Sequence, residues 1–171
     1  EESAHRFAQR HAPGAVLVHR VLETTAWGTR HAIVAFQRRK SDEGERRIEG
    51  VLYLPRRPGE YRRIEIDTYR PEGGTPRIES VFFADAGRDK RRVLVVLVAW
   101  PQVHADVRGT LYGVHVYGAP EDDYDESRLP FERETSARLE PGCDCTYRDG
   151  RKTQARYKSA EAVRAALKEL R

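Results

Sequence analysis

Three neighbouring segments decide the fold: Ile78-Glu-Ser-Val-Phe-Phe-Ala84, Asp85-Ala-Gly-Arg-Asp89 and Val93-Leu-Val-Val-Leu-Val-Ala-Trp100. The outer two are apolar and rich in β-branched and aromatic residues, and the middle one has the composition of a turn. This pattern predicts the central hairpin of an antiparallel sheet. Residues of both parities are apolar in the last segment, so we expect that strand to be covered on both of its faces.

Further strands are expected on both sides of this hairpin, with turn residues between them. Tyr61–Tyr69 alternates between apolar and charged residues, as a strand with one solvated face does. The regular spacing is typical of meanders, sandwiches and propeller blades. We expect strands at Ala15–Leu22, Arg30–Arg38, Ile48–Leu54, Tyr61–Tyr69, Arg77–Ala84, Arg92–Trp100 and Thr110–Tyr117.

A short helix is expected near each end of the sequence. Ser3–His11 can form one that Pro13 and Gly14 stop. In the last segment Ser159 is suited to be an N-cap, and an apolar stripe with helical spacing follows it: Val163, Ala166, Leu167 and Leu170. The predicted fold class is therefore α+β, mainly β. We expect an antiparallel meander or propeller-like sheet with a short N-terminal helix and a C-terminal helix packed on the sheet.

The length of 171 residues is that of one domain, and no linker or repeat interrupts it, so we expect a single domain over residues 1–171. The 31 Lys and Arg exceed the 27 Asp and Glu, which gives a formal net charge of +4. Basic and acidic residues are interleaved, as in Glu43-Gly-Glu-Arg-Arg-Ile-Glu49, and no aromatic-plus-basic recognition motif accompanies them. Nucleic acid is therefore not the expected partner.

Two features favour an exported protein. The chain has no methionine, so we expect a processed or trimmed chain, as removal of a signal peptide or a trimmed end would produce. Its longest apolar run, Val93–Trp100, is far shorter than the roughly 20 residues that span a membrane, so no integral membrane segment is expected. The only two cysteines lie in Pro141-Gly-Cys-Asp-Cys145, as in an exported protein with one disulfide. The expected location is periplasmic or secreted.

Cys143 and Cys145 are predicted to form that disulfide. The loop that it closes is very short, so the bond removes little entropy from the unfolded chain and stabilises weakly. The spacing also differs from the Cys-x-x-Cys of thiol oxidoreductases, so we expect a local structural clip and not a redox site.

The hairpin turn carries two carboxylates, Asp85 and Asp89, and two interpretations follow. Their oxygens could bind Ca²⁺ together with backbone carbonyls and water, which makes calcium the one candidate cofactor. In the other interpretation Asp85 caps the turn backbone while Asp89 pairs with Arg91 or Arg92. The acidic run Glu121–Glu126 is likewise either a cation site or a solvated loop.

Catalytic motifs are not recognisable in the sequence, so an enzyme is the less favoured class. The six histidines do not fall at metal-ligand spacings, and no serine has a nucleophile-elbow context. His104 and Asp106 could orient a general base, but no activated nucleophile is indicated nearby. A pair of carboxylates across a cleft, as in glycosidases, stays open as an alternative.

One stretch of the chain resembles a known family. Val81-Phe-Phe-Ala-Asp-Ala-Gly-Arg-Asp-Lys-Arg-Arg-Val-Leu-Val-Val96, followed by Gly109-Thr-Leu-Tyr-Gly-Val-His-Val-Tyr117, resembles a degenerate FG-GAP-type unit. The resemblance implies a propeller-like sheet with a calcium loop, but Gly87 replaces the second acidic ligand and Arg88 the usual glycine. Exported bacterial proteins with such units include lysozyme-inhibitor-like immunity proteins, which this chain is similar to in size.

The function expected is that of a periplasmic binding or interaction protein, and its specific form is an inhibitor or immunity protein against a cell-wall hydrolase. The alternatives are a small hydrolase with an unrecognised carboxylate site and a structural envelope protein. Because Trp, Tyr and Arg dominate binding hot spots, two loops are candidate partner-binding surfaces. The first is Ala99–Gly109, with Trp100, His104, Asp106 and Arg108, and the second is Pro71–Thr75, which follows Tyr69 and Arg70.

Overall fold

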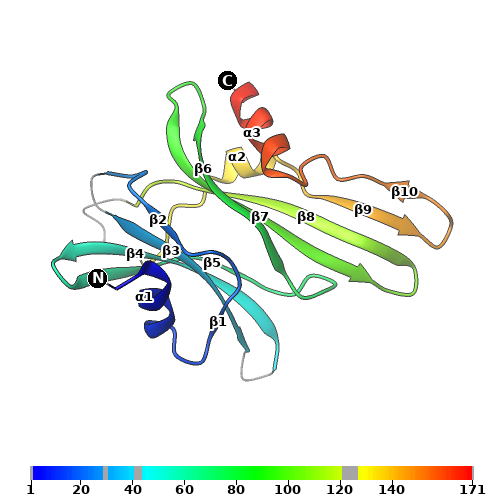
Figure 1. Ribbon diagram of the computed structural model, residues 1–171. Helices are drawn as coiled ribbons and strands as arrows, with labels where there is room; N and C mark the ends of the chain where they lie inside the picture. Colours follow the sequence, from blue (N-terminus) through cyan, green and yellow to red (C-terminus); the bar gives the residue numbers. More distant parts are fainter. Residues whose placement is uncertain (1, 29–30, 41–43, 121–126, 171) are drawn as a thin grey trace. The chain divides into compact units, whose positions relative to one another are not determined.

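The computed structural model describes residues 2–28, 31–40, 44–120 and 127–170. By its internal contacts the chain divides into two compact units, each built on one five-stranded antiparallel sheet (Figure 1). Unit 1 comprises Glu1–Arg70 and Ala119–Leu129, and unit 2 comprises Pro71–Gly118 and Pro130–Arg171. The mainly β, α+β class is confirmed. The single domain expected over the whole chain stays a prediction.

The sheet of unit 1 is covered on part of one face by helix α1 (Ala4–Arg10), whose N-cap Ser3 accepts a hydrogen bond from the Arg6 backbone. Phe7 and Ala8 of this helix pack on Ile33 and Tyr53, which lie on the sheet. The strands are β1 (Val16–Leu17), β2 (Leu22–Thr24), β3 (Ala32–Lys40), β4 (Arg46–Arg57) and β5 (Glu60–Tyr69), in the order β1-β3-β4-β5 with β2 also paired to β3.

The sheet of unit 2 is a meander in which every strand pairs with its neighbour in sequence. Its strands are β6 (Arg77–Ala86), β7 (Arg91–Val103), β8 (Val107–Tyr117), β9 (Gly142–Tyr147) and β10 (Lys152–Thr153). Helix α2 (Arg133–Arg138) lies between β8 and β9 in sequence, and helix α3 (Ala160–Glu169) follows β10. Figure 1 shows α3 beside the sheet near β6 and β7.

Strand β7 is the most deeply buried part of unit 2. Every residue from Val93 to Ala99 is at most 1% exposed, which confirms the strand covered on both faces. Leu97 and Val95 point into a core that Val163 and Leu167 of α3 complete, so the predicted stripe of the C-terminal helix packs on the sheet. The β6–β7 hairpin was expected at the centre of the sheet, but only β7 is an inner strand, because β6 lies at the edge in the order β10-β9-β8-β7-β6.

Three expectations about elements were wrong or incomplete. Ala15–Leu22 is not one strand, because Val16 pairs with Arg38 and Leu22 with Val34. The seven residues 16–22 therefore face only five residues of β3, and the two extra residues cannot pair with it. Ala99–Gly109 is not one loop, because β7 continues to Val103 and β8 begins at Val107. Helix α2 and strands β9 and β10 were not predicted.

Two further findings concern regions named above. The acidic run Glu121–Glu126 lies outside the described residues. Of the helices that the structure describes, none combines the length and the apolar character needed to cross a membrane.

Candidate functional site

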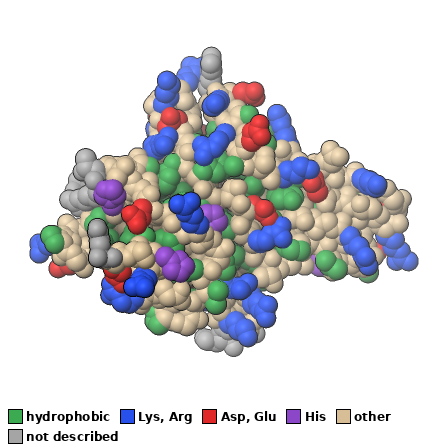
Figure 2. Space-filling view, in the orientation of Figure 1, with side chains coloured by type: hydrophobic (Ala, Val, Ile, Leu, Met, Phe, Trp, Pro, Cys, Tyr) green, Lys and Arg blue, Asp and Glu red, His purple; other side chains and the backbone are tan. Residues whose placement is uncertain are grey.

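A basic cleft of about 1070 Å³ lies in unit 2 between the β6–β7 turn and α3. Five of the side chains that line it are cationic and one, Asp85, is a carboxylate. Lys and Arg side chains gather around this turn and helix at the top of Figure 2. The lining residues are Phe83, Ala84, Asp85, Gly87, Arg88, Lys90, Arg92, Arg164, Leu167 and Lys168.

The turn holds two of these cations away from the sheet. Ala86 and Arg91 are the last paired residues of the hairpin, so the four residues between them form its tip. Gly87 has a φ of +74° and Lys90 a φ of +51°, a left-handed conformation that few side-chain-bearing residues adopt. The Lys90 N–H donates to the Gly87 carbonyl at 3.3 Å. Arg88 and Lys90 are thereby exposed at the tip.

The helix places two more cations on the other side of the cleft. Val163 and Leu167 of α3 are buried, and the residue after each of them, Arg164 and Lys168, is exposed. The Arg164 guanidinium donates from Nη1 to the Phe83 carbonyl at 3.0 Å and lies 4.1 Å above the Phe82 ring. Arg164 therefore ties α3 to β6.

Most of the cleft's positive charge is not neutralised within it. Asp85 pairs with Arg92 at 3.0 Å. The side chains of Arg88, Lys90 and Lys168 form no ion pair with any described residue. Unit 2 contains 16 Lys and Arg against 12 Asp and Glu, whereas unit 1 contains 15 of each, so the whole net charge of +4 belongs to unit 2. The cleft thus offers anionic groups a positive wall above an apolar floor.

The predicted calcium ligands take part in ion pairs with arginines. Asp85 contacts Arg92, and Asp89 contacts Arg91 at 3.0 Å. The Asp89–Arg91 pair is the one named in the second interpretation, whereas Asp85, which was expected there to cap the turn backbone, pairs with Arg92. Within the described ranges no three His, Cys, Asp or Glu side chains gather as metal ligands would. Calcium binding at this turn stays a prediction.

The predicted partner-binding residues do not gather in one place. Trp100 is 5% exposed within β7 and Tyr69 is 3% exposed at the end of β5, so neither is the exposed anchor that was expected. They are buried because each belongs to a strand and not to a loop. Arg70 is exposed and lies 3.9 Å from Glu45.

The remaining three residues of that prediction lie around the β7–β8 connection. His104, Asp106 and Arg108 are exposed there, and Asp106 lies 3.6 Å from Arg148. The basic cleft is at the beginning of β7, whereas these residues follow its end, so the two surfaces are separated by the length of a 13-residue strand.

The cysteine pair lies on β9. Cys143 and Cys145 are bonded, with Cα atoms 5.2 Å apart, so the predicted pair is at disulfide distance. Asp144, between them, accepts hydrogen bonds at 2.6 Å from the Ala155 N–H and from Lys158 Nζ. The hydrogen bond from the Lys158 ammonium holds the pKa of Asp144 below its usual range.

We expect the oxidised protein to gain about 2 Da in intact mass when the Cys143–Cys145 bond is reduced. The thermal midpoint should shift only slightly, because the closed loop is too short to restrict the unfolded chain strongly. Mass spectrometry and a melting curve with and without reductant measure both effects. An unchanged mass after reduction would mean that the bond is absent.

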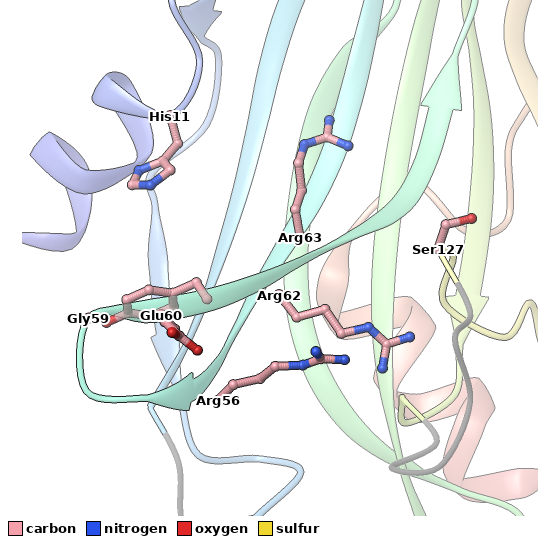
Figure 3. Close-up of a pocket in the computed structure, with 8 residues that line it drawn as sticks. His11, Arg56, Gly59, Glu60, Arg62, Arg63 and Ser127 are labelled. Atoms are coloured by element: carbon pink, nitrogen blue, oxygen red, sulfur yellow. The ribbon is translucent and has the colours of Figure 1, made fainter.

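Unit 1 has a second basic hollow, of about 590 Å³, at the β4–β5 hairpin (Figure 3). Arg56 and Arg62 run along one side of β5, and Arg63 points to the other, as neighbouring residues of a strand do. His11, at the end of α1, reaches the same hollow, where its ring stacks on Phe7 at 4.0 Å.

A third hollow of unit 1, of about 790 Å³, brings two carboxylates and two histidines together and bears on the hydrolase alternative. Its lining includes Glu2 and Glu23 together with His11 and His31. Glu2 binds Arg10 at 2.8 Å, and this hydrogen bond lowers the pKa of Glu2. A general acid at neutral pH needs the opposite shift, so Glu2 is unsuited to that role.

Of the residues that line the basic cleft, Asp85 was a candidate in the sequence but the five cations were missed, although one signal pointed to two of them. Arg164 and Lys168 are four residues apart and each follows a residue of the apolar stripe, so they border the buried face of α3. Nothing in the sequence places them opposite Arg88 and Lys90. No family model, no curated protein and no solved structure matches this chain.

Proposed function

We propose that this is a binding protein that recognises an acidic protein surface through the basic cleft of unit 2. The observation that carries the proposal is the set of five cationic side chains against one carboxylate, in the unit that holds the whole net charge. Such a field steers acidic partners and selects against basic ones.

The floor of the cleft supports a protein partner. Leu167 and Ala84 are buried apolar residues, and Phe83 beside them is half-buried. A partner that covers this floor removes water from the surrounding guanidinium groups, which strengthens their hydrogen bonds to carboxylates. Arginine and aromatic residues are also the types enriched at the centres of interfaces.

The specific form of the proposal is an inhibitor or immunity protein for a cell-wall hydrolase, in the periplasm or outside the cell. Glycoside hydrolases commonly hold two carboxylates across the bond that they cleave. The hairpin tip displays Arg88 and Lys90, two cations without an ion-pair partner among the described residues, on a turn narrow enough to approach such a cleft. The FG-GAP-type resemblance supports the same function.

We expect Lys90→Glu/Lys168→Glu to weaken binding of a fluorescein-labelled glutamate-rich peptide by about tenfold or more at low salt. The double variant reverses two charges on opposite sides of the cleft, so that attraction becomes repulsion. Fluorescence anisotropy at several salt concentrations measures the affinity and its salt dependence.

The matched control is Arg108→Glu/Lys152→Glu, which reverses two exposed cations of unit 2 outside the cleft. It should change the affinity by less than about threefold, because only the long-range field is altered. Equal losses in both variants would refute the cleft as the binding site. Loss in the control alone would favour the surface around His104, Asp106 and Arg108.

The inhibitor form of the proposal is tested separately, by measuring the rate at which a muramidase degrades a cell-wall suspension. The wild-type protein should slow the reaction, and Lys90→Glu/Lys168→Glu should not. If neither protein slows it while the peptide still binds at the cleft, the inhibitor form is excluded and the binding function remains.

A further inference from the structure

Three strands of unit 1 direct arginines at one carboxylate. Oε2 of Glu49, on β4, lies 3.1 Å from Arg39 Nε and 3.9 Å from Arg63 Nη2, and its Oε1 lies 3.3 Å from Arg47 Nη2. Gln37 Nε2 donates to Glu49 Oε2 at 3.1 Å. We call these three arginines and Glu49 the arginine cluster.

The register of the sheet explains the convergence. Arg39 of β3 pairs with Arg47 of β4, and two residues further along Gln37 pairs with Glu49. Residues two apart on a strand share a face, so all four side chains leave the sheet on the same side. Arg63 reaches them from β5.

The charges of the arginine cluster do not balance. Three guanidinium groups face one carboxylate, which leaves a charge of +2. The side chains differ in exposure: the exposed fractions are 49% for Arg63, 35% for Arg39, 30% for Arg47 and 14% for Glu49. Water therefore weakens the repulsion between the three guanidinium groups without removing it, and the net charge of +2 remains.

Two donors of the arginine cluster are also unsatisfied. The Nε atoms of Arg39 and Arg47 are buried and form no hydrogen bond with a described residue; the Arg39 Nε is close to Glu49, but its N–H is not aligned with the carboxylate. A buried donor without an acceptor costs free energy, and the cost is larger for a charged group. One more anion at the accessible ends of the guanidinium groups would balance the excess charge.

We propose that the arginine cluster binds a phosphate group. A phosphate dianion carries the charge of −2 that balances the cluster, whereas a second carboxylate would balance half of it. Guanidinium forks bind phosphate oxygens through paired hydrogen bonds. The cluster borders two hollows, because Arg63 lines the one in Figure 3 and Arg39 lines another of about 470 Å³.

The phosphate site is independent of the proposed binding function. It is built from β3, β4 and β5 of unit 1, whereas the basic cleft is built from β6, β7 and α3 of unit 2. The effect of a substitution on phosphate binding can therefore be measured without altering residues of the basic cleft, and the reverse also holds.

The test is titration with inorganic phosphate at constant ionic strength, with chloride as the balancing ion. Phosphate should bind saturably by ³¹P NMR and raise the thermal midpoint of the wild-type protein, and Arg47→Gln should reduce both effects. Glu49→Gln should bind phosphate about fivefold or more tighter, because the carboxylate that repels the dianion is gone.

Glu65→Gln is the matched control. Glu65 is also a partly buried glutamate of this sheet, but it pairs with one arginine, Arg128, at 3.1 Å. Its substitution should leave phosphate affinity unchanged. Should Glu49→Gln be unfolded in chloride, refolding on addition of phosphate would support the site, and failure to refold at any phosphate concentration would overturn it. Absence of saturable binding to the wild type would also overturn it.

Phenyl phosphate distinguishes the source of the phosphate group. Binding as tight as that of inorganic phosphate, or tighter, identifies a phosphomonoester as the ligand, because the organic group is then tolerated. If phenyl phosphate does not bind, the ligand is the free phosphate ion.

Discussion

Leu97→Asp should unfold unit 2. Leu97 is fully buried in β7 and belongs to the core that α3 completes. The substitution places an unpaired carboxylate there, at a cost of at least about 4 kcal/mol, which is a large fraction of the roughly 5–15 kcal/mol that stabilises an ordinary domain. Circular dichroism and a thermal melt measure the loss.

The control is Val103→Asp in the same strand. Val103 is 73% exposed, so its carboxylate stays in water and the melting temperature should change little. A folded Leu97→Asp variant with the wild-type midpoint would show that Leu97 of β7 does not lie in the core.

Gly109→Ala should destabilise unit 2 strongly, although it adds only a methyl group. Gly109 has a φ of +155° and lies opposite Cys145, where β8 and β9 approach closely. A Cβ at this position would collide with the Asp144 carbonyl oxygen and lie 2.7 Å from the Cα of Cys145. Both neighbours are backbone, so the two strands must separate, and we expect a loss of about 3 kcal/mol by denaturant unfolding.

Gly150→Ala isolates the conformational part of this effect. Gly150 has a φ of +85°, but a Cβ added there would have no atom within 4 Å, so only backbone strain of about 1 kcal/mol is expected. If the two variants lose equal stability, steric contact between β8 and β9 is not what requires Gly109.

The sequence was most informative where periodicity and burial agree. The β6–β7 hairpin and the stripe of α3 were predictable because long apolar runs have few alternative structures. Strands β9 and β10 were not, because Cys143–Tyr147 alternates weakly and Lys152–Thr153 is only two residues long. Their pairing is decided by contacts with β8, which local sequence does not encode.

The candidate sites depend still more on tertiary structure. Arg39, Arg47 and Arg63 are spread over 25 residues and converge on Glu49 only after three strands have paired. Trp100 and Tyr69 were expected to be exposed anchors because each lies next to a predicted loop. In the structure both side chains are buried. Exposure is set by where a strand ends, which is the least predictable feature of a β protein.

The contact between Arg164 and Phe83 has a consequence for self-association. Strand β6 is the outermost of its sheet, and such a strand can add a strand from a second molecule. The Arg164 guanidinium occupies the Phe83 carbonyl, one of the acceptors that an added strand would need. A strand added along β6 would have to displace the Arg164 guanidinium from this carbonyl, so we expect α3 to oppose pairing at this edge.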